Sequence, residues 1–221
     1  MIGAGDVVFL LDVDNTLLDN DRFAQALDAR LAQSFGTAER DRYWAIFEQL
    51  RAEFGVADYL ASLQSFRRGL DDHPQLLRMS EFLLEFPFAS LLYAGALEAV
   101  AHLGTLGTTA VLSDGDVIFQ PRKIQRAGIW DAVEGRVMIY THKERSLAQV
   151  ESRYPAAHYV MIDDKAALLA AMKPLLGARL TTVYVRQGHY AAAAGAAAIR
   201  PPPDRSIAGI GALRDTALSD F

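Results

Sequence analysis

The chain contains no cysteine among its 221 residues. Disulfide bonds and thiolate metal sites are therefore excluded, an absence that is compatible with a reducing compartment. The sequence also has no apolar run long enough to cross a membrane. The apolar run that follows Asp6 is too short for the core of a signal peptide, and no basic segment precedes it. From these features we expect a cytoplasmic protein.

Neither sign of charge dominates the sequence. The chain has 22 basic and 27 acidic residues, a formal net charge of −5, and both kinds are spread along its length. This balance favours neither a nucleic acid nor a membrane as the main partner. Apolar residues make up 51% of the chain, enough for one large domain or for a core with a smaller insertion. A small molecule is the expected partner, and the oligomeric state stays open.

Short apolar segments predict five strands of one sheet. Most of them are apolar throughout rather than alternating, which is typical of strands that are covered on both faces, as in a parallel sheet. Helical patterns separate the last four, which indicates βαβ units. The sequence therefore predicts a doubly wound parallel α/β sheet with strands at residues 7–13, 108–113, 136–140, 158–163 and 181–185.

The long interval between the first two predicted strands has helical periodicity instead. Apolar residues fall on one helical face around Tyr43 and Phe47, and again around Met79 and Leu83. We predict an inserted helical cap domain here, and an extension rich in alanine and proline at the end of the chain. The expected units are an α/β core over 1–19 and 94–190, a cap over 20–93 and an extension over 191–221.

Polar side chains cluster at the carboxyl ends of four predicted strands. In open α/β sheets ligands bind at these ends, near the switch point in strand order. Carboxylates are the ligands that Mg²⁺ prefers, and a hydroxyl and a lysine can hold phosphate oxygens. The residues at these ends are Asp12, Asp14, Ser113, Asp114, Lys143, Asp163 and Asp164.

Each of these groups has a structural interpretation when it is taken alone. Asp12 and Asp14 would also suit a turn, as would the segment Ser113–Gly115. Asp164 could be the N-cap of a helix that starts at Lys165. Adjacent acids after a buried strand repel each other unless a cation compensates, which makes the pair harder to explain structurally.

The segment after the third strand fits a capping box, with Thr141 as N-cap and Glu144 at the third helical position. Lys143 then lies in the first helical turn, where a lysine opposes the helix dipole unless an anion binds there. His142 and His189 have no ligand-spaced partner and are interpreted as structural. Lys123, beside two arginines, is interpreted as part of a basic helix start and as a weaker phosphate candidate.

The ordered set of motifs resembles the haloacid dehalogenase-like (HAD) hydrolase superfamily, in its phosphatase branch with a helical cap. Its four signature segments would be Asp12–Thr16, Ser113–Gly115, Lys143 and the pair Asp163-Asp164. Two departures are Ile162, where many members have glycine, and Glu144, where many have proline. Neither departure removes a catalytic functional group.

The resemblance implies a Mg²⁺-dependent phosphatase that acts on a small phosphorylated metabolite. Asp12 would attack phosphorus and form an aspartyl-phosphate, while Asp14 would move protons. Ser113, Asp114 and Lys143 would bind the phosphoryl group, the first and last of them as catalytic residues. Mg²⁺ would be held by Asp12, Asp14 (through its carbonyl), Asp163 and Asp164. The cap would select the leaving group.

Several alternatives stay open on this fold. A dehalogenase needs the nucleophile but neither Mg²⁺ nor a second acid, so Asp14 and the acidic pair favour phosphate. A phosphonate-cleaving relative would lack Asp14. A phosphomutase uses the same residues and differs in what the cap admits. A phospho-acceptor signalling domain has its motifs in another order, and a non-catalytic phosphate-binding protein is also possible. Residues that could contact the substrate from the cap, or be solvated charges, are Arg22, Arg67, Arg68 and His73.

Overall fold

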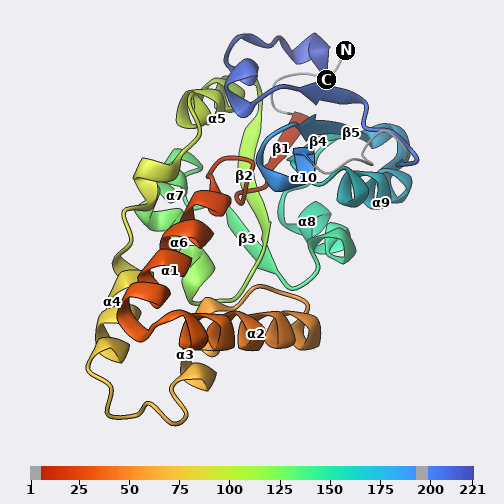
Figure 1. The fold of residues 1–221 in the computed structure, drawn as a ribbon. Helices are drawn as coiled ribbons and strands as arrows, with labels where there is room; N and C mark the ends of the chain where they lie inside the picture. Colours follow the sequence, from red (N-terminus) through yellow and green to blue (C-terminus); the bar gives the residue numbers. More distant parts are fainter. Residues whose placement is uncertain (1–5, 193–198) are drawn as a thin grey trace.

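A six-stranded, fully parallel sheet forms the centre of the molecule, in the order β3-β2-β1-β4-β5-β6 (Figure 1). The computed structural model describes residues 6–192 and 199–221. The doubly wound α/β fold predicted from the sequence is confirmed. The strands are β1 (Val7–Leu11), β2 (Thr108–Asp114), β3 (Val137–Tyr140), β4 (His158–Asp163), β5 (Leu180–Val185) and β6 (Arg205–Ile207).

Helices cover both faces of the sheet, which explains why its central strands are apolar throughout. In β1, Phe9 and Leu11 face one apolar cluster, whereas Val8 and Leu10 face a second cluster on the other side. Alternate side chains of a strand point to opposite faces, so both sets are buried. The helices that follow β1 to β5 in the core are α5 (Ala96–Leu106), α6 (Phe119–Arg126), α7 (Ile129–Ala132), α8 (Leu147–Arg153), α9 (Ala166–Leu176) and α10 (Gly188–Ala192).

The first four of the five α-helices between β1 and β2 form what we call the helical insertion, and the fifth, α5, packs in the core. The four helices of the insertion are drawn from red to yellow on one side of the sheet in Figure 1. Their buried residues, such as Leu27, Tyr43 and Met79, join the same apolar cluster as Phe9 of the sheet. Whether the insertion behaves as a separate domain therefore stays a prediction. Its helices are α1 (Asn20–Phe35), α2 (Thr37–Phe54), α3 (Tyr59–Phe66) and α4 (Gln75–Glu85).

The two connections of the helical insertion to the sheet run side by side. An antiparallel bridge pairs Leu18 with Leu92. The amide of Asp19 donates to the carbonyl of Leu91 at 2.8 Å, and the amide of Tyr93 donates to the carbonyl of Leu17 at 3.0 Å. The chain therefore leaves the sheet and returns to it through one short hydrogen-bonded ribbon.

The end of the chain adds a strand that the sequence analysis missed. β6 pairs in parallel with β5, and Asp204 just before it accepts hydrogen bonds from the backbone amide and the hydroxyl of Thr182, both at 2.8 Å. The extension beyond residue 191 therefore contributes residues 205–207 to the sheet. The alanine-rich stretch at 193–198 lies outside the described residues.

Candidate active site

The strand order reverses at β1, and three buried carboxylates lie there at the carboxyl end of the sheet. The chain runs from β1 outwards to β2 and β3, then returns to place β4 on the other side of β1. Asp12 directly follows β1, Asp163 ends β4, and Asp164 comes next. One carboxylate oxygen from each lies within 4.8 Å of the other two. The topology thus brings together the three acids that the sequence analysis expected at this edge.

The ammonium of Lys143 lies inside this group of acids. It donates a hydrogen bond to Asp12 Oδ1 and lies 2.6 Å from Asp163 Oδ2 as an ion pair, with no exposed surface on the lysine. Burial alone would lower the pKa of Lys143, but the charges of Asp12, Asp163 and Asp114 raise it above its ordinary value. Lys143 is therefore a permanent cation beside the proposed nucleophile.

One lysine does not neutralise the group. Both carboxylate oxygens of Asp164 and the second oxygen of Asp12 are buried without a hydrogen-bond partner. Burial, and then the charges of Asp12 and Asp163, raise the pKa of Asp164 to about 9. Burial also raises the pKa of Asp163, against the lowering effect of Lys143. These buried carboxylates have oxygens without a hydrogen-bond partner, and Asp163 and Asp164 resist ionisation. A divalent cation would bind these carboxylates and compensate their negative charge.

Lys165 is a second lysine near the acids, and the sequence analysis did not include it in the site. Its amide donates to Asp163 Oδ1 at 2.7 Å, and its ammonium lies 5.4 Å from the centre of the Tyr190 ring. Burial would lower its pKa, but Asp12 and Asp163 raise it. The side chain of Asp164 does not cap α9, since Lys165 is the N-cap residue and neither carboxylate oxygen of Asp164 accepts a hydrogen bond. The N-cap interpretation of Asp164 is therefore wrong.

Ser113 and Asp114 lie at the carboxyl end of β2, the strand beside β1. Ser113 is buried, and its hydroxyl accepts a hydrogen bond from the side-chain amide of Gln120 at 2.9 Å. Asp114 accepts a hydrogen bond from the backbone amide of Lys143 at 2.8 Å, which fixes the loop after β3. That loop holds a short 3₁₀ turn over Lys143–Arg145 without a side-chain cap, so the predicted capping box is wrong.

Asp14 lies at the mouth of the site, where α6 holds both of its oxygens. Lys123 Nζ lies 2.5 Å from Oδ1, and Gln120 Nε2 donates to Oδ2 at 3.2 Å. Lys123 is buried, whereas the side chain of Asp14 keeps 29% of its surface exposed. The interpretation of Lys123 as a phosphate-binding residue is not supported, because its ammonium is committed to Asp14.

Asn15 anchors the turn that follows Asp14. It adopts a φ of +62°, a left-handed conformation that asparagine tolerates better than most residues. Its side-chain amide donates to Asp21 at 3.0 Å, and its carbonyl oxygen accepts from the amide of Asn20 at 3.0 Å. His189 Nδ1 lies 2.7 Å from Asp21 Oδ1. His189, which the sequence analysis left as structural, thus joins α10 to the start of α1 at the site.

A cavity of about 650 Å³ opens over these residues, between the sheet and the helical insertion. The core contributes Asp14, Asp114 and Lys165 to its wall. The insertion contributes an aromatic and mixed polar surface from α2 and from the start of α3. These residues are Trp44, Phe47, Glu48, Arg51 and Tyr59.

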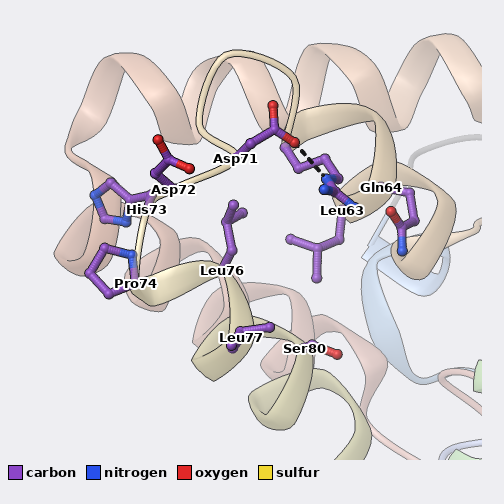
Figure 2. Close-up of a pocket in the computed structure, with 10 residues that line it drawn as sticks. Leu63, Gln64, Asp71, Asp72, His73, Pro74, Leu76, Leu77 and Ser80 are labelled. Atoms are coloured by element: carbon purple, nitrogen blue, oxygen red, sulfur yellow. Dashed lines mark hydrogen bonds and ion pairs between the residues drawn. The ribbon is translucent and has the colours of Figure 1, made fainter.

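Another cavity lies at the turn between α3 and α4, far along the insertion from the acids. Figure 2 shows its lining residues, among them Asp71, His73 and Leu76. Arg67 belongs to this second cavity, where it pairs with Asp71 at 2.9 Å. Of the four cap residues proposed as substrate contacts, none lines the cavity over the acids. Sequence analysis overlooked Arg51, which does, because one arginine on an amphipathic helix carries no distinguishing signal.

Comparison with known proteins identifies the family. A family model described as haloacid dehalogenase-like hydrolase matches residues 7–175. This chain belongs to the HAD-like hydrolase family. Among solved structures, a haloacid dehalogenase-like hydrolase from Burkholderia xenovorans LB400 is 55% identical, with a TM-score of 0.89, over 96% of this chain and 99% of that one. No curated protein matches the chain.

More distant HAD structures share the fold. An L-2-haloacid dehalogenase from Xanthobacter autotrophicus is 18% identical, with a TM-score of 0.60, over 95% of this chain and 97% of its own. A magnesium-bound HAD hydrolase from Bacillus subtilis is 16% identical, with a TM-score of 0.59, over 96% of this chain and 99% of its own. At such identity the likeness establishes the fold alone. Within the described residues, no helix is long and apolar enough to span a membrane.

Proposed function

We propose that this HAD-like hydrolase is a Mg²⁺-dependent phosphatase that acts on a small phosphorylated metabolite. The observation that carries the proposal is the buried group of Asp12, Asp163 and Asp164, in which several carboxylate oxygens lack a partner. Five carboxylates at the site (the three above with Asp14 and Asp114) face the lysines at 123, 143 and 165, a formal excess of two negative charges when all five carboxylates are ionised. A divalent cation would cancel this excess.

The metal would be held by Asp12, Asp163, Asp164 and the backbone carbonyl of Asp14. When bound, it would supply positive charge to the phosphoryl oxygens and to the nucleophile. This donor set contains oxygen only, which fits Mg²⁺ better than a softer metal. Asp12 Oδ2 and both oxygens of Asp164 are free of protein hydrogen bonds and are therefore available as ligands.

The protein side chains supply the remaining chemistry. An oxygen of Asp12 attacks phosphorus, the bond from phosphorus to the ester oxygen breaks, and Asp14, protonated at the start of the cycle, gives its proton to the leaving oxygen and becomes a carboxylate. Water then attacks the aspartyl-phosphate, Asp14 accepts a proton from that water, and phosphate leaves with Asp12 regenerated. Ser113 and Lys143 hold the phosphoryl oxygens as their charge is redistributed in the transition state.

Asp14 favours phosphate transfer over dehalogenation. Attack on carbon with loss of halide needs no proton donor, because halide leaves as a stable anion. A dehalogenase would therefore have no use for Asp14, which Gln120 and Lys123 hold at the mouth of the cavity. The cavity of about 650 Å³ suits a metabolite rather than a macromolecule. We extend the proposal to a cytoplasmic location and to a small phosphoester as the partner.

The test is hydrolysis of p-nitrophenyl phosphate in Mg²⁺, with release of chloride from L-2-chloropropionate measured in parallel. We expect phosphate release that EDTA abolishes and that Asp12→Asn lowers by a factor of at least about 10³. Release of chloride without Mg²⁺, and no phosphate release, would replace this proposal with a dehalogenase. Phosphate release that persists in Asp12→Asn would contradict the nucleophile.

A further inference from the structure

Lys123 is a buried cation that neither the metal ligands nor the phosphoryl-binding residues account for. Its side chain is 1% exposed, and its ammonium lies 2.5 Å from Asp14 Oδ1 and 3.3 Å from Asn20 Oδ1. Burying an ammonium is costly unless it is paired and hydrogen-bonded. The pairing with Asp14 therefore accounts for the burial of this ammonium group.

Gln120 completes the hold on Asp14 and connects it to Ser113. Its side-chain nitrogen donates to Asp14 Oδ2 at 3.2 Å and to Ser113 Oγ at 2.9 Å. An amide nitrogen carries two hydrogens, so both bonds can form at once. Because Ser113 accepts from Gln120, its hydroxyl acts as a donor to another group. In this structure the hydroxyl is directed to the carbonyl of Asp114 at 3.2 Å.

The sequence builds this arrangement into the segment that follows β2. Gln120 and Lys123 are three residues apart on α6, a spacing that places both on one helical face. Asp116 accepts from the amides of Ile118 and Phe119 at 2.8 and 2.6 Å and so fixes the start of α6. A Cβ at Gly115 would lie 2.8 Å from both Cβ and Cγ of Gln120. Because Gly115 has no side chain, the side chain of Gln120 can occupy this space.

We propose that Lys123 and Gln120 are positioning residues of the reaction. Together they hold the two oxygens of Asp14, and Gln120 also orients the hydroxyl of Ser113 as a donor to the phosphoryl group. Asp14 lines the cavity, where its carboxyl group in the protonated form would give the proton to the leaving oxygen. This inference rests on the proposed phosphatase activity and adds the residues that set the geometry of proton transfer.

The experiment compares two phosphoesters whose leaving groups differ in their need for a proton. p-Nitrophenolate leaves unaided, whereas the alkoxide of glycerol 2-phosphate must be protonated by Asp14. For Lys123→Met we expect kcat on glycerol 2-phosphate to fall about 100-fold, kcat on p-nitrophenyl phosphate about threefold, and KM to stay within about twofold for both. Gln120→Leu should lower kcat on both substrates, because it also releases Ser113.

A double variant separates positioning from a general structural defect. If Lys123 acts through Asp14, then Lys123→Met in an Asp14→Asn background lowers kcat no further than Asp14→Asn alone. Arg122→Met is the matched control, because Arg122 is the neighbouring cation on α6 and pairs with Glu85 at 2.5 Å, away from the acids. We expect it to keep wild-type kcat on both substrates. Lys123→Gln, which keeps a polar group in the buried position, replaces Lys123→Met if that variant does not fold.

Two results would overturn the inference while leaving the phosphatase intact. One is an equal loss on both phosphoesters in the Lys123 variant. The other is a double variant whose loss is the full product of the two single losses. A wild-type protein with no activity on either phosphoester would instead overturn the proposed function, and this inference with it.

Discussion

Metal binding at the acidic group should be coupled to the release of a proton. Asp164 is buried beside Asp12 and Asp163, and its pKa is raised to about 9. At pH 7 it is then ionised in only about 1% of metal-free molecules. Mg²⁺ needs the ionised carboxylate, so each ion that binds at neutral pH displaces about one proton.

The exchange of one proton for one metal ion sets how steeply Mg²⁺ affinity depends on pH. With one proton displaced, the apparent Kd for Mg²⁺ falls about tenfold for each pH unit between about pH 6 and 8, or about 1.4 kcal/mol per unit. Isothermal titration calorimetry in buffers with different heats of ionisation measures the proton count directly. Asp164→Asn should bind Mg²⁺ more weakly, with less than half of this pH dependence.

The same titration affects the stability of the metal-free protein. The folded pKa of Asp164 lies above its unfolded value of about 3.9, so the protonated group stabilises the fold fully below about pH 4. That contribution is lost as pH rises towards about 9. We expect Tm in EDTA to fall over this range by more than it falls in Asp164→Asn. Mg²⁺ affinity that is independent of pH, with no proton release, would show that Asp164 is already ionised and would refute the argument from burial.

Three further predictions concern other parts of the molecule. Asp14→Asn should keep Mg²⁺ affinity within about threefold but lower kcat on an alkyl phosphate by about 10² or more, and an unchanged rate would contradict its acid role. Arg51→Gln should raise KM for an anionic phosphoester by about tenfold with kcat nearly unchanged, since Arg51 is the cation that α2 places on the cavity wall, and equal KM values would remove it from substrate binding. Gly107→Ala should lower stability by about 1–3 kcal/mol, because its Cβ would lie 2.6 Å from the carbonyl oxygen of Val7. Gly104→Ala, in the open on α5, is the matched control and should raise stability by about 0.5–1 kcal/mol in chemical denaturation.

The parallel sheet could be predicted because its inner strands are buried on both faces. Their side chains, such as those of β1 and β4, must be apolar at every position, and this pattern is visible in one sequence. β6 could not be predicted in the same way. It is three residues long, lies at the edge of the sheet and is only partly buried, so its sequence Arg-Ser-Ile resembles a loop.

The acidic site could be predicted because each of its groups directly follows a strand. The positions of Asp12, Ser113 and Asp163 depend only on the sheet, whose geometry is regular. Lys123 and Gln120 depend instead on how α6 packs against Asp14, and no local pattern distinguishes a buried lysine from a solvated one. The one available signal was the spacing of three residues between Gln120 and Lys123, which places both on one helical face shortly after Gly115 of the second motif.

The paired connections at Leu18 and Leu92 bring the two ends of the helical insertion to one place on the sheet. Because its two ends are hydrogen-bonded to each other, a different segment could replace α1 to α4 without a change in the distance that it must bridge. The acids, Ser113 and Lys143 all lie outside the exchanged segment and would keep their places. A replacement segment would also have to cover the apolar cluster that the helical insertion shares with Phe9, and to supply a partner for Asn15 in place of Asp21.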